Sequence, residues 1–255
     1  MLLFLICILK NLKIINIFIT GVLGTLWYWN FITIEIISVF YIFKIKKLNF
    51  WDFLTGIILS ACCCTENFNP VITPVIFFSF LSGTCIFRKY NQKFKFSTNL
   101  KNILKNIIFG ILIAIIPGII NFTEFLVKNY NLEINLYNIW PAFLRALNPS
   151  ISEEIVFRFF MLAVVTDIFK NKIPKTKIAN LLIYILLILP HVLMHDEFAQ
   201  EYWISNIFSM ILYLIYNCLV FGIPSVWLIK NKNLWSAISF HWFCDFVRFI
   251  FFKNY

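Results

Sequence analysis

Long apolar runs, separated by short lysine-rich segments, constrain this chain more than any other feature of its sequence. The runs cover residues 21–43, 53–64, 71–87, 107–120, 139–169, 178–195, 203–229 and 234–252. A bilayer offers the backbone no water, so an apolar segment of about 20 residues that crosses it must satisfy its own peptide groups as a helix. The pattern therefore predicts an all-α fold, a polytopic transmembrane helix bundle of about eight spans.

Composition excludes the main alternatives to a membrane protein. Of the 255 residues, 61% are hydrophobic and only 13% are charged, whereas a soluble domain averages about 25% charged residues. The 31 phenylalanines also exclude a disordered chain, which carries too few apolar side chains to form a core. We expect one membrane domain over residues 1–255, in which 1–147 are N-terminal helices without an assigned role and 148–255 carry the catalytic motifs.

The net charge of +10 is concentrated in the short segments between the apolar runs. These segments are Lys44 to Lys47, residues 88–105, residues 170–177, and Lys230 with Lys232. Loops rich in lysine and arginine mark the cytoplasmic side of a membrane protein. The charge therefore indicates an integral, multi-pass protein whose partner is the lipid bilayer, and not a nucleic-acid-binding protein.

Ionisable side chains within the apolar runs are the candidates for function, because each costs at least about 2.5–3.5 kcal/mol to insert. The first group is Glu153, Glu154 and Arg158, which read E-E-x-x-x-R. Residues 148–150 precede it and predict a break followed by a helix cap, with both acids in the first turn. The alternative interpretation is that both glutamates only cap this helix.

The two glutamates differ in the partners that their spacing provides. Glu154 and Arg158 are four residues apart, so they share a helix face and can neutralise each other. Glu153 has no such partner in its own helix, which suits it to take a proton from water as a general base. Glu35, the comparable acid in an early run, is assigned no catalytic role.

All three histidines of the chain lie in two further motifs with the same spacing of four. His191 and His195 end one apolar run, and His241 and Asp245 lie within the last run. At about 1.5 Å per residue, His195 is about 25 Å from the basic segment that begins its helix, and His241 is about 10 Å from its own. We therefore expect a kink at Pro190, a tilt or an early end of the bilayer to bring the two motifs together.

These residue types are the ones that peptide hydrolysis needs. A carboxylate can accept the proton of a water, one histidine can help orient that water, and a second can stabilise the developing oxyanion. Glu153, His195 and His241 also match the ligand types of zinc, with water in the fourth position. Since the H-E-x-x-H pattern of zinc proteases is missing, a zinc site and a metal-free mechanism are equally open.

The three motifs, in this order and on separate helices, resemble those of the CPBP family of CAAX proteases and bacteriocin-processing enzymes, also called the ABI family. Members of that family carry E-E-x-x-x-R, then F-x-x-x-H, then H-x-x-x-N or H-x-x-x-D. The matching residues here are Glu153, Glu154 and Arg158, then His191 and His195, then His241 and Asp245. The resemblance covers about residues 148–246.

The resemblance implies a role for each of these residues. Glu153 and His195 would activate the water, while His241 with Asp245 would hold the oxyanion or orient a group. Glu154, also a member of the catalytic set, would form the structural pair with Arg158, in agreement with their spacing.

This chain departs from the family pattern at two positions. His191 replaces the usual phenylalanine, and Phe159 follows Arg158 where glycine is common. His191 would then be either a supporting partner of His195 or an additional ligand.

The sequence thus predicts an intramembrane endopeptidase. Its substrate would be a membrane-associated or lipidated protein or peptide. Two other interpretations stand beside it: a non-catalytic membrane scaffold or immunity-type relative, and a proton-coupled transporter. The transporter is disfavoured because the polar residues gather in one half of the chain, whereas transporters usually carry internal repeats.

Overall fold

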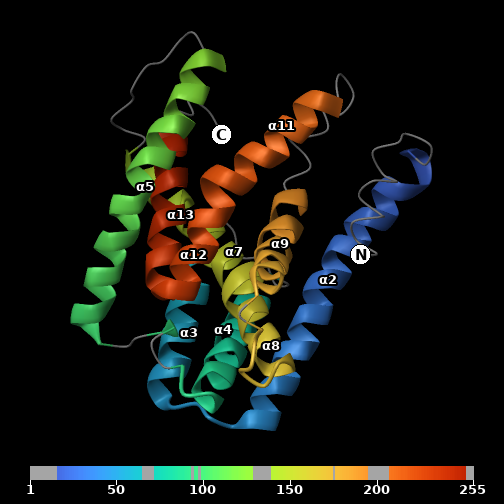
Figure 1. Ribbon diagram of the computed structural model, residues 1–255, viewed down its shortest axis with the longest axis vertical. Helices are drawn as coiled ribbons and strands as arrows, with labels where there is room; N and C mark the ends of the chain where they lie inside the picture. The colour runs from blue at the N-terminus through green and yellow to red at the C-terminus, as the bar shows by residue number, and fades with distance from the viewer. Residues whose placement is uncertain are drawn as a thin grey trace.

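The computed structural model describes residues 16–64, 72–92, 95–96, 99–128, 139–174, 176–194 and 207–250. Every regular element in these residues is helical (Figure 1). In chain order they are α2 (Asn16–Ile45), α3 (Phe50–Cys62), α4 (Ile72–Lys89), α5 (Leu100–Lys128), α6 (Ile139–Arg145), α7 (Leu147–Glu153), η3 (Glu154–Phe160), α8 (Met161–Ile168), α9 (Lys177–Met194), α11 (Ile207–Asn217), η4 (Cys218–Gly222), α12 (Ile223–Asn231) and α13 (Leu234–Ile250). The predicted all-α fold is therefore confirmed for the part of the chain that the structure describes.

Three of the helical segments are long and apolar enough to cross a membrane. They are Ile72–Lys89, Leu100–Ile120 and Leu214–Asn231, and the shorter apolar helices Phe50–Cys62 and Lys177–Val192 accompany them within the described residues. The predicted number of about eight spans remains a prediction.

The outer face of α5 is apolar and exposed. Leu104, Ile108, Leu112 and Ile116 recur every four residues along this helix and are each more than half exposed. Residues four apart share one face, so they form a continuous apolar stripe. A soluble protein rarely exposes such a surface, and lipid is the environment that suits it.

The core lies where α4 packs against η3 and α8. The rings of Phe80 on α4 and Phe159 on η3 stack with their centroids 6.1 Å apart, and Phe87 lies 5.2 Å from Phe159. All three side chains are buried. This aromatic contact fixes η3, which carries the E-E-x-x-x-R motif, against the rest of the bundle.

Two segments of the bundle are π-helical. The first, η3, begins at Glu154 and continues the axis of α7 into α8. The second, η4, ends at Gly222 and leads directly into α12, with Pro224 in the first turn. Single π-helical turns within α-helices are frequent at functional sites. Both of these turns lie next to the residues described in the following subsection.

The start of the motif helix differs from the sequence prediction. Residues 148–150 do not form a break and cap, because α7 is already helical from Leu147, with no side-chain cap at Ala146. The hydroxyl groups of Ser150 and Ser152 instead donate to the carbonyls of Leu147 and Asn148, at 3.0 and 2.8 Å. The cap prediction was wrong because these polar side chains bond backwards within a continuing helix.

The start of α13 is buried, although the turn before it is partly exposed. Asn233 and Leu234 are 3% and 0% exposed, whereas Asn231 and Lys232 are exposed, and the loop between α4 and α5 contacts the neighbouring residues. Within that loop, Phe96 packs on Trp235 with ring centroids 5.6 Å apart, and the ammonium group of Lys95 donates to the Ile229 carbonyl at 3.0 Å. A cation at the carbonyl end of a helix is favourable. Residues 95–96 of the loop therefore connect the end of α12 with the start of α13.

Helix α13 packs most extensively on α5, and the closest approach is at Gly110. A methyl group built at this position would overlap the carbonyl oxygen of Ser236 and the hydroxyl of Ser239. At Gly118, by contrast, the nearest atom to such a methyl is a ring carbon of Phe243, at 3.1 Å. Small residues let membrane helices approach closely, and here Gly110 performs that role.

We expect Gly110→Ala to lower the free energy of unfolding by about 1–3 kcal/mol, because the added methyl must displace the backbone of α13. Gly118→Ala is the matched control on the same helix, where a flexible ring can move aside. Thermal unfolding of both variants in detergent measures the difference. Equal melting midpoints for the two variants would contradict the close backbone contact.

Candidate active site

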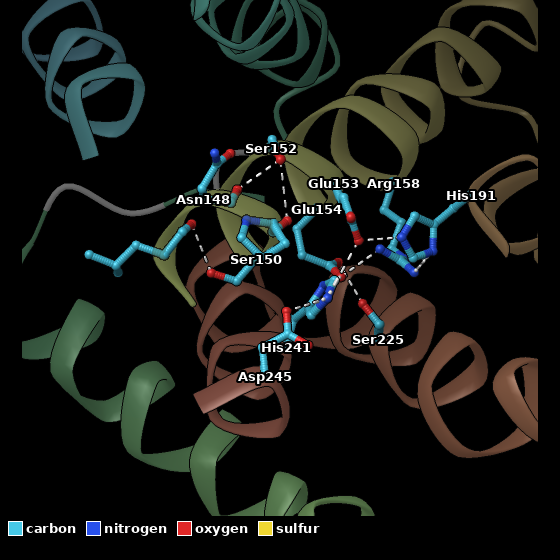
Figure 2. Close-up of polar contacts among 12 residues, drawn as sticks. Asn148, Ser150, Ser152, Glu153, Glu154, Arg158, His191, Ser225, His241 and Asp245 are labelled. Carbon is cyan, nitrogen blue, oxygen red and sulfur yellow. Dashed lines mark hydrogen bonds and ion pairs between the residues drawn. The ribbon is translucent and has the colours of Figure 1, made fainter. Parts of the chain in front are cut away.

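The junction of α7 and η3 carries the acidic residues of the site. Glu153 is the last residue of α7, and Glu154 and Arg158 lie in η3. Figure 2 shows their side chains directed toward residues of α9, α12 and α13. Helices that are distant in the sequence therefore converge on this junction.

Glu154 and Arg158 form the buried ion pair that their spacing predicted. Arg158 Nη1 donates to Glu154 Oε1 at 2.6 Å, and the side chains are 2% and 0% exposed. Desolvating two charges is expensive, so such a pair persists only when further hydrogen bonds satisfy its other atoms. The alternative interpretation, that the glutamates only cap the helix, does not fit this buried contact.

His191 lies between Arg158 and Glu153. Arg158 Nη2 is 2.9 Å from His191 Nδ1, and His191 Nε2 is hydrogen-bonded to Glu153 Oε2 (Figure 2). A guanidinium can only donate, so Nδ1 must be the acceptor and the imidazole is neutral, with its proton on Nε2. Arg158 thereby fixes the tautomer that donates to Glu153.

His241 approaches the same carboxylates from α13. Its Nδ1 is 2.9 Å from Glu154 Oε1, while its Nε2 is 3.4 Å from Glu153 Oε2 and 3.3 Å from Asp245 Oδ2. Because Glu154 accepts from Arg158, His241 Nδ1 is the donor to it. Nε2 then faces two carboxylates, so a proton must lie either on this nitrogen or on one of those oxygens.

Ser225 is a residue of the site that the sequence analysis missed. Its buried hydroxyl donates to Glu154 Oε2 at 2.5 Å from the first turn of α12. No spacing to the other motifs marks this serine in the sequence. A polar residue just after Pro224 within an apolar run was the only available signal.

The structure brings together six of the seven residues that the sequence predicted for the site. These are Glu153, Glu154, Arg158, His191, His241 and Asp245. The seventh, His195, lies outside the described residues. The rings of His191 and His241 are 6.0 Å apart between centroids, so α9 and α13 do meet at the level of His191.

The described site supplies the parts of a water-activating centre. The carboxylate of Glu153 accepts a hydrogen bond from His191 and lies near His241, and all three side chains keep some exposure, between 10% and 16%. Glu154 and Arg158 lie beneath them and are almost fully buried. The arrangement places a general base beside a histidine donor, both only slightly exposed, above a buried ionic layer.

The comparisons with known proteins bear on this set of residues. Residues 135–247 match the family model described as Type II CAAX prenyl endopeptidase Rce1-like. These residues form an Rce1-like domain. The match confirms the resemblance to a CPBP family intramembrane protease and supports an intramembrane endopeptidase in general. No curated protein and no solved structure matches the chain.

The Rce1-like domain holds every site residue named above, from Glu153 to Asp245. Together with the three apolar helices, the match indicates a membrane protein. Residues N-terminal to the domain contribute α4 and α5, which pack against η3 and α13. The first half of the chain therefore supports the helices that carry the site.

The zinc ligands predicted from the sequence are only partly described. No group of three or more His, Cys, Asp and Glu side chains among the described residues has the geometry to hold one. Of the predicted zinc ligands, Glu153 and His241 lie close together, and His195 is outside the described residues. We derive no step of the chemistry through a metal.

The Arg158→Met variant should lower the free energy of unfolding by about 3–5 kcal/mol, because it leaves the carboxylate of Glu154 buried without its guanidinium partner. Thermal unfolding in detergent measures this loss. The double variant Glu154→Leu, Arg158→Met removes both charges and should regain part of the lost stability. An Arg158→Met protein as stable as the wild type would show that the pair is not an energetic requirement.

Proposed function

We propose that this protein is a multi-pass membrane endopeptidase that hydrolyses a peptide bond with water activated by Glu153 and histidine. The observation that carries the proposal is the convergence of His191 Nε2 and His241 Nε2 on one oxygen of Glu153. The family name gives a CAAX prenyl endopeptidase as its activity. We therefore take a membrane-associated or lipidated protein or peptide as the substrate class.

In this mechanism Glu153 accepts the proton of a water that attacks the peptide carbonyl. His191, held in its Nε2-protonated form by Arg158, orients the carboxylate. His241 donates from Nε2 to the carbonyl oxygen as negative charge develops on it. Glu153 then returns its proton to the leaving amine, so that the site regains its starting protonation state.

The remaining residues hold these groups in place. Glu154 accepts from His241 Nδ1, which directs Nε2 toward Glu153 and Asp245. Asp245, one helical turn from His241, favours a proton on that nitrogen. Ser225 and Arg158 satisfy the Glu154 carboxylate and keep it fixed. Donors fixed in advance cost no reorganisation during the reaction.

Glu153→Gln should reduce proteolysis by at least about 100-fold, because an amide cannot accept the proton of water. The measurement compares new peptide termini in membranes that contain the wild type or the variant at matched abundance. Glu35→Gln, at the comparable acid of α2, is the control and should leave the termini unchanged. If no terminus depends on Glu153 in a folded, abundant protein, the scaffold interpretation replaces the enzyme.

The same comparison with and without a strong chelator tests the two mechanisms that the sequence left open. Termini that persist in chelator support the metal-free mechanism proposed here. Termini that disappear with chelator and return with added zinc would show that a metal takes part, and would overturn the metal-free mechanism.

His191→Ala and His195→Ala separate the two histidines of the second motif. The contact with Glu153 leads us to expect a loss of at least about 100-fold for His191→Ala. His195, the water partner that the family resemblance implies, should then be the less sensitive position. The reverse order of sensitivity would restore the role of His195 and make His191 its supporting partner.

A further inference from the structure

A cavity lies at the lysine-rich end of the bundle, apart from the catalytic residues. It has a volume of about 470 Å³ and opens where the segment before α9 meets the end of α12. Ile173, Pro174 and Ile183 supply its apolar wall, while Lys177, Lys230 and Asn180 supply its polar groups. Helices α9 and α12 pack against each other beside it.

The two lysines of this cavity come from different helices. Lys177 is the first residue of α9 and is exposed, whereas Lys230 lies in the last turn of α12 and is half-buried. The ammonium group of Lys230 donates to Asn180 Oδ1 and lies 4.7 Å from the ring centroid of Tyr184. Lys230 is thereby held at the cavity, and neither lysine has a carboxylate partner among the described residues.

The surrounding chain contains no acid to balance this charge. Residues 88–123, 168–195 and 202–244 include no aspartate or glutamate. Asp167, just before the second of these segments, already accepts hydrogen bonds from Lys89 and Tyr90 at 2.5 and 2.8 Å. Among the described residues, no carboxylate lines the cavity, so its two lysines give it a positive charge.

A third lysine, Lys95, adds its charge next to Lys230, at the end of α12. The ammonium group of Lys95 is buried and donates to the carbonyls of Ile229 and Lys230. Burial, reinforced by repulsion from the charge of Lys230, lowers the pKa of Lys95 to about 8. An anion in the cavity would relieve the repulsion between these ammonium groups.

Helix α9 also carries exposed apolar side chains in the turns that follow Lys177. Leu181, Leu182 and Ile185 on the next turns of α9 are 58%, 59% and 44% exposed. A ligand with an anionic head and an apolar body would place the head between the lysines and the body along α9. Basic pockets between membrane helices on the cytoplasmic side bind anionic lipid headgroups in this way.

We propose that this cavity binds the phosphate headgroup of an anionic phospholipid, with Lys177 and Lys230 as its ligands. The inference rests on the membrane placement in the proposed function, but not on proteolysis. The lipid's acyl chains lie along the exposed apolar face of α9, and the headgroup holds the segment before α9 against the end of α12.

The test uses the full-length protein in an uncharged detergent, titrated with dioctanoyl phosphatidylglycerol, dioctanoyl phosphatidylcholine or inorganic phosphate. The readout is the melting midpoint followed by tryptophan fluorescence, since a ligand that binds only the folded state raises it. Of the three ligands, phosphatidylglycerol should raise the melting midpoint at the lowest ligand concentration. An equal effect of phosphatidylcholine would overturn the charge-based site, and an equal effect of phosphate would assign it to a free phosphate-bearing anion.

Variants locate the effect at the cavity. Lys177→Gln with Lys230→Gln should weaken the response to phosphatidylglycerol by about fivefold in concentration for each lysine removed. Lys172→Gln removes one charge from the segment before α9 but not from the cavity wall, so it is the matched control for Lys177→Gln and should respond as the wild type does. A double variant that responds like Lys172→Gln overturns the proposal.

Two further variants keep the outcome interpretable. If the double variant does not fold, the exposed Lys177→Gln alone carries the test, because its side chain does not belong to the core. Glu153→Gln should bind the lipid as the wild type does. A protein that shows lipid binding without proteolysis, or proteolysis without lipid binding, would distinguish failure of one proposal from failure of the other.

Discussion

Burying a carboxylate and a guanidinium together in an apolar bundle is costly, and four segments of this structure supply hydrogen bonds to them, although Arg158 Nε is left without a partner among the described residues. Glu154 takes hydrogen bonds from three elements: Arg158 in η3, Ser225 in α12 and His241 in α13. Arg158 reaches a fourth element through His191 in α9. Because an unsatisfied buried charge is so unfavourable, this one pair dictates how four segments are placed around it.

The same requirement explains why the reactive groups lie above this ionic layer. One nitrogen of each histidine ring contacts the Glu154–Arg158 pair, and the other nitrogen of each ring faces Glu153. The orientation of the proposed catalytic nitrogens thus follows from the structural pair beneath them. In this respect the stability and the proposed chemistry of the site have one physical origin.

The sequence predicted the helical fold and most of the site, because both depend on local spacing. Apolar length predicts helices, and a spacing of four places Glu154 with Arg158 and His241 with Asp245 on common faces. Ser225 could not be predicted, since its role depends on where η4 directs α12. The meeting of His191 with His241 could not be predicted from depth along each helix, because it depends on how α9 and α13 are placed in the bundle.

The contact at Gly110 has a consequence for the environment of the site. On one side of α5 lies the exposed apolar stripe from Leu104 to Ile116, and on the other the backbone of α13 touches Gly110 with no side chain between them. In a bilayer, the hydrocarbon chains are then separated from α13 by a single helix about 10 Å thick. The bilayer itself thereby forms part of the low-dielectric wall around His241 and Asp245, so the strength of their electrostatic interactions depends on the lipid as well as on the protein.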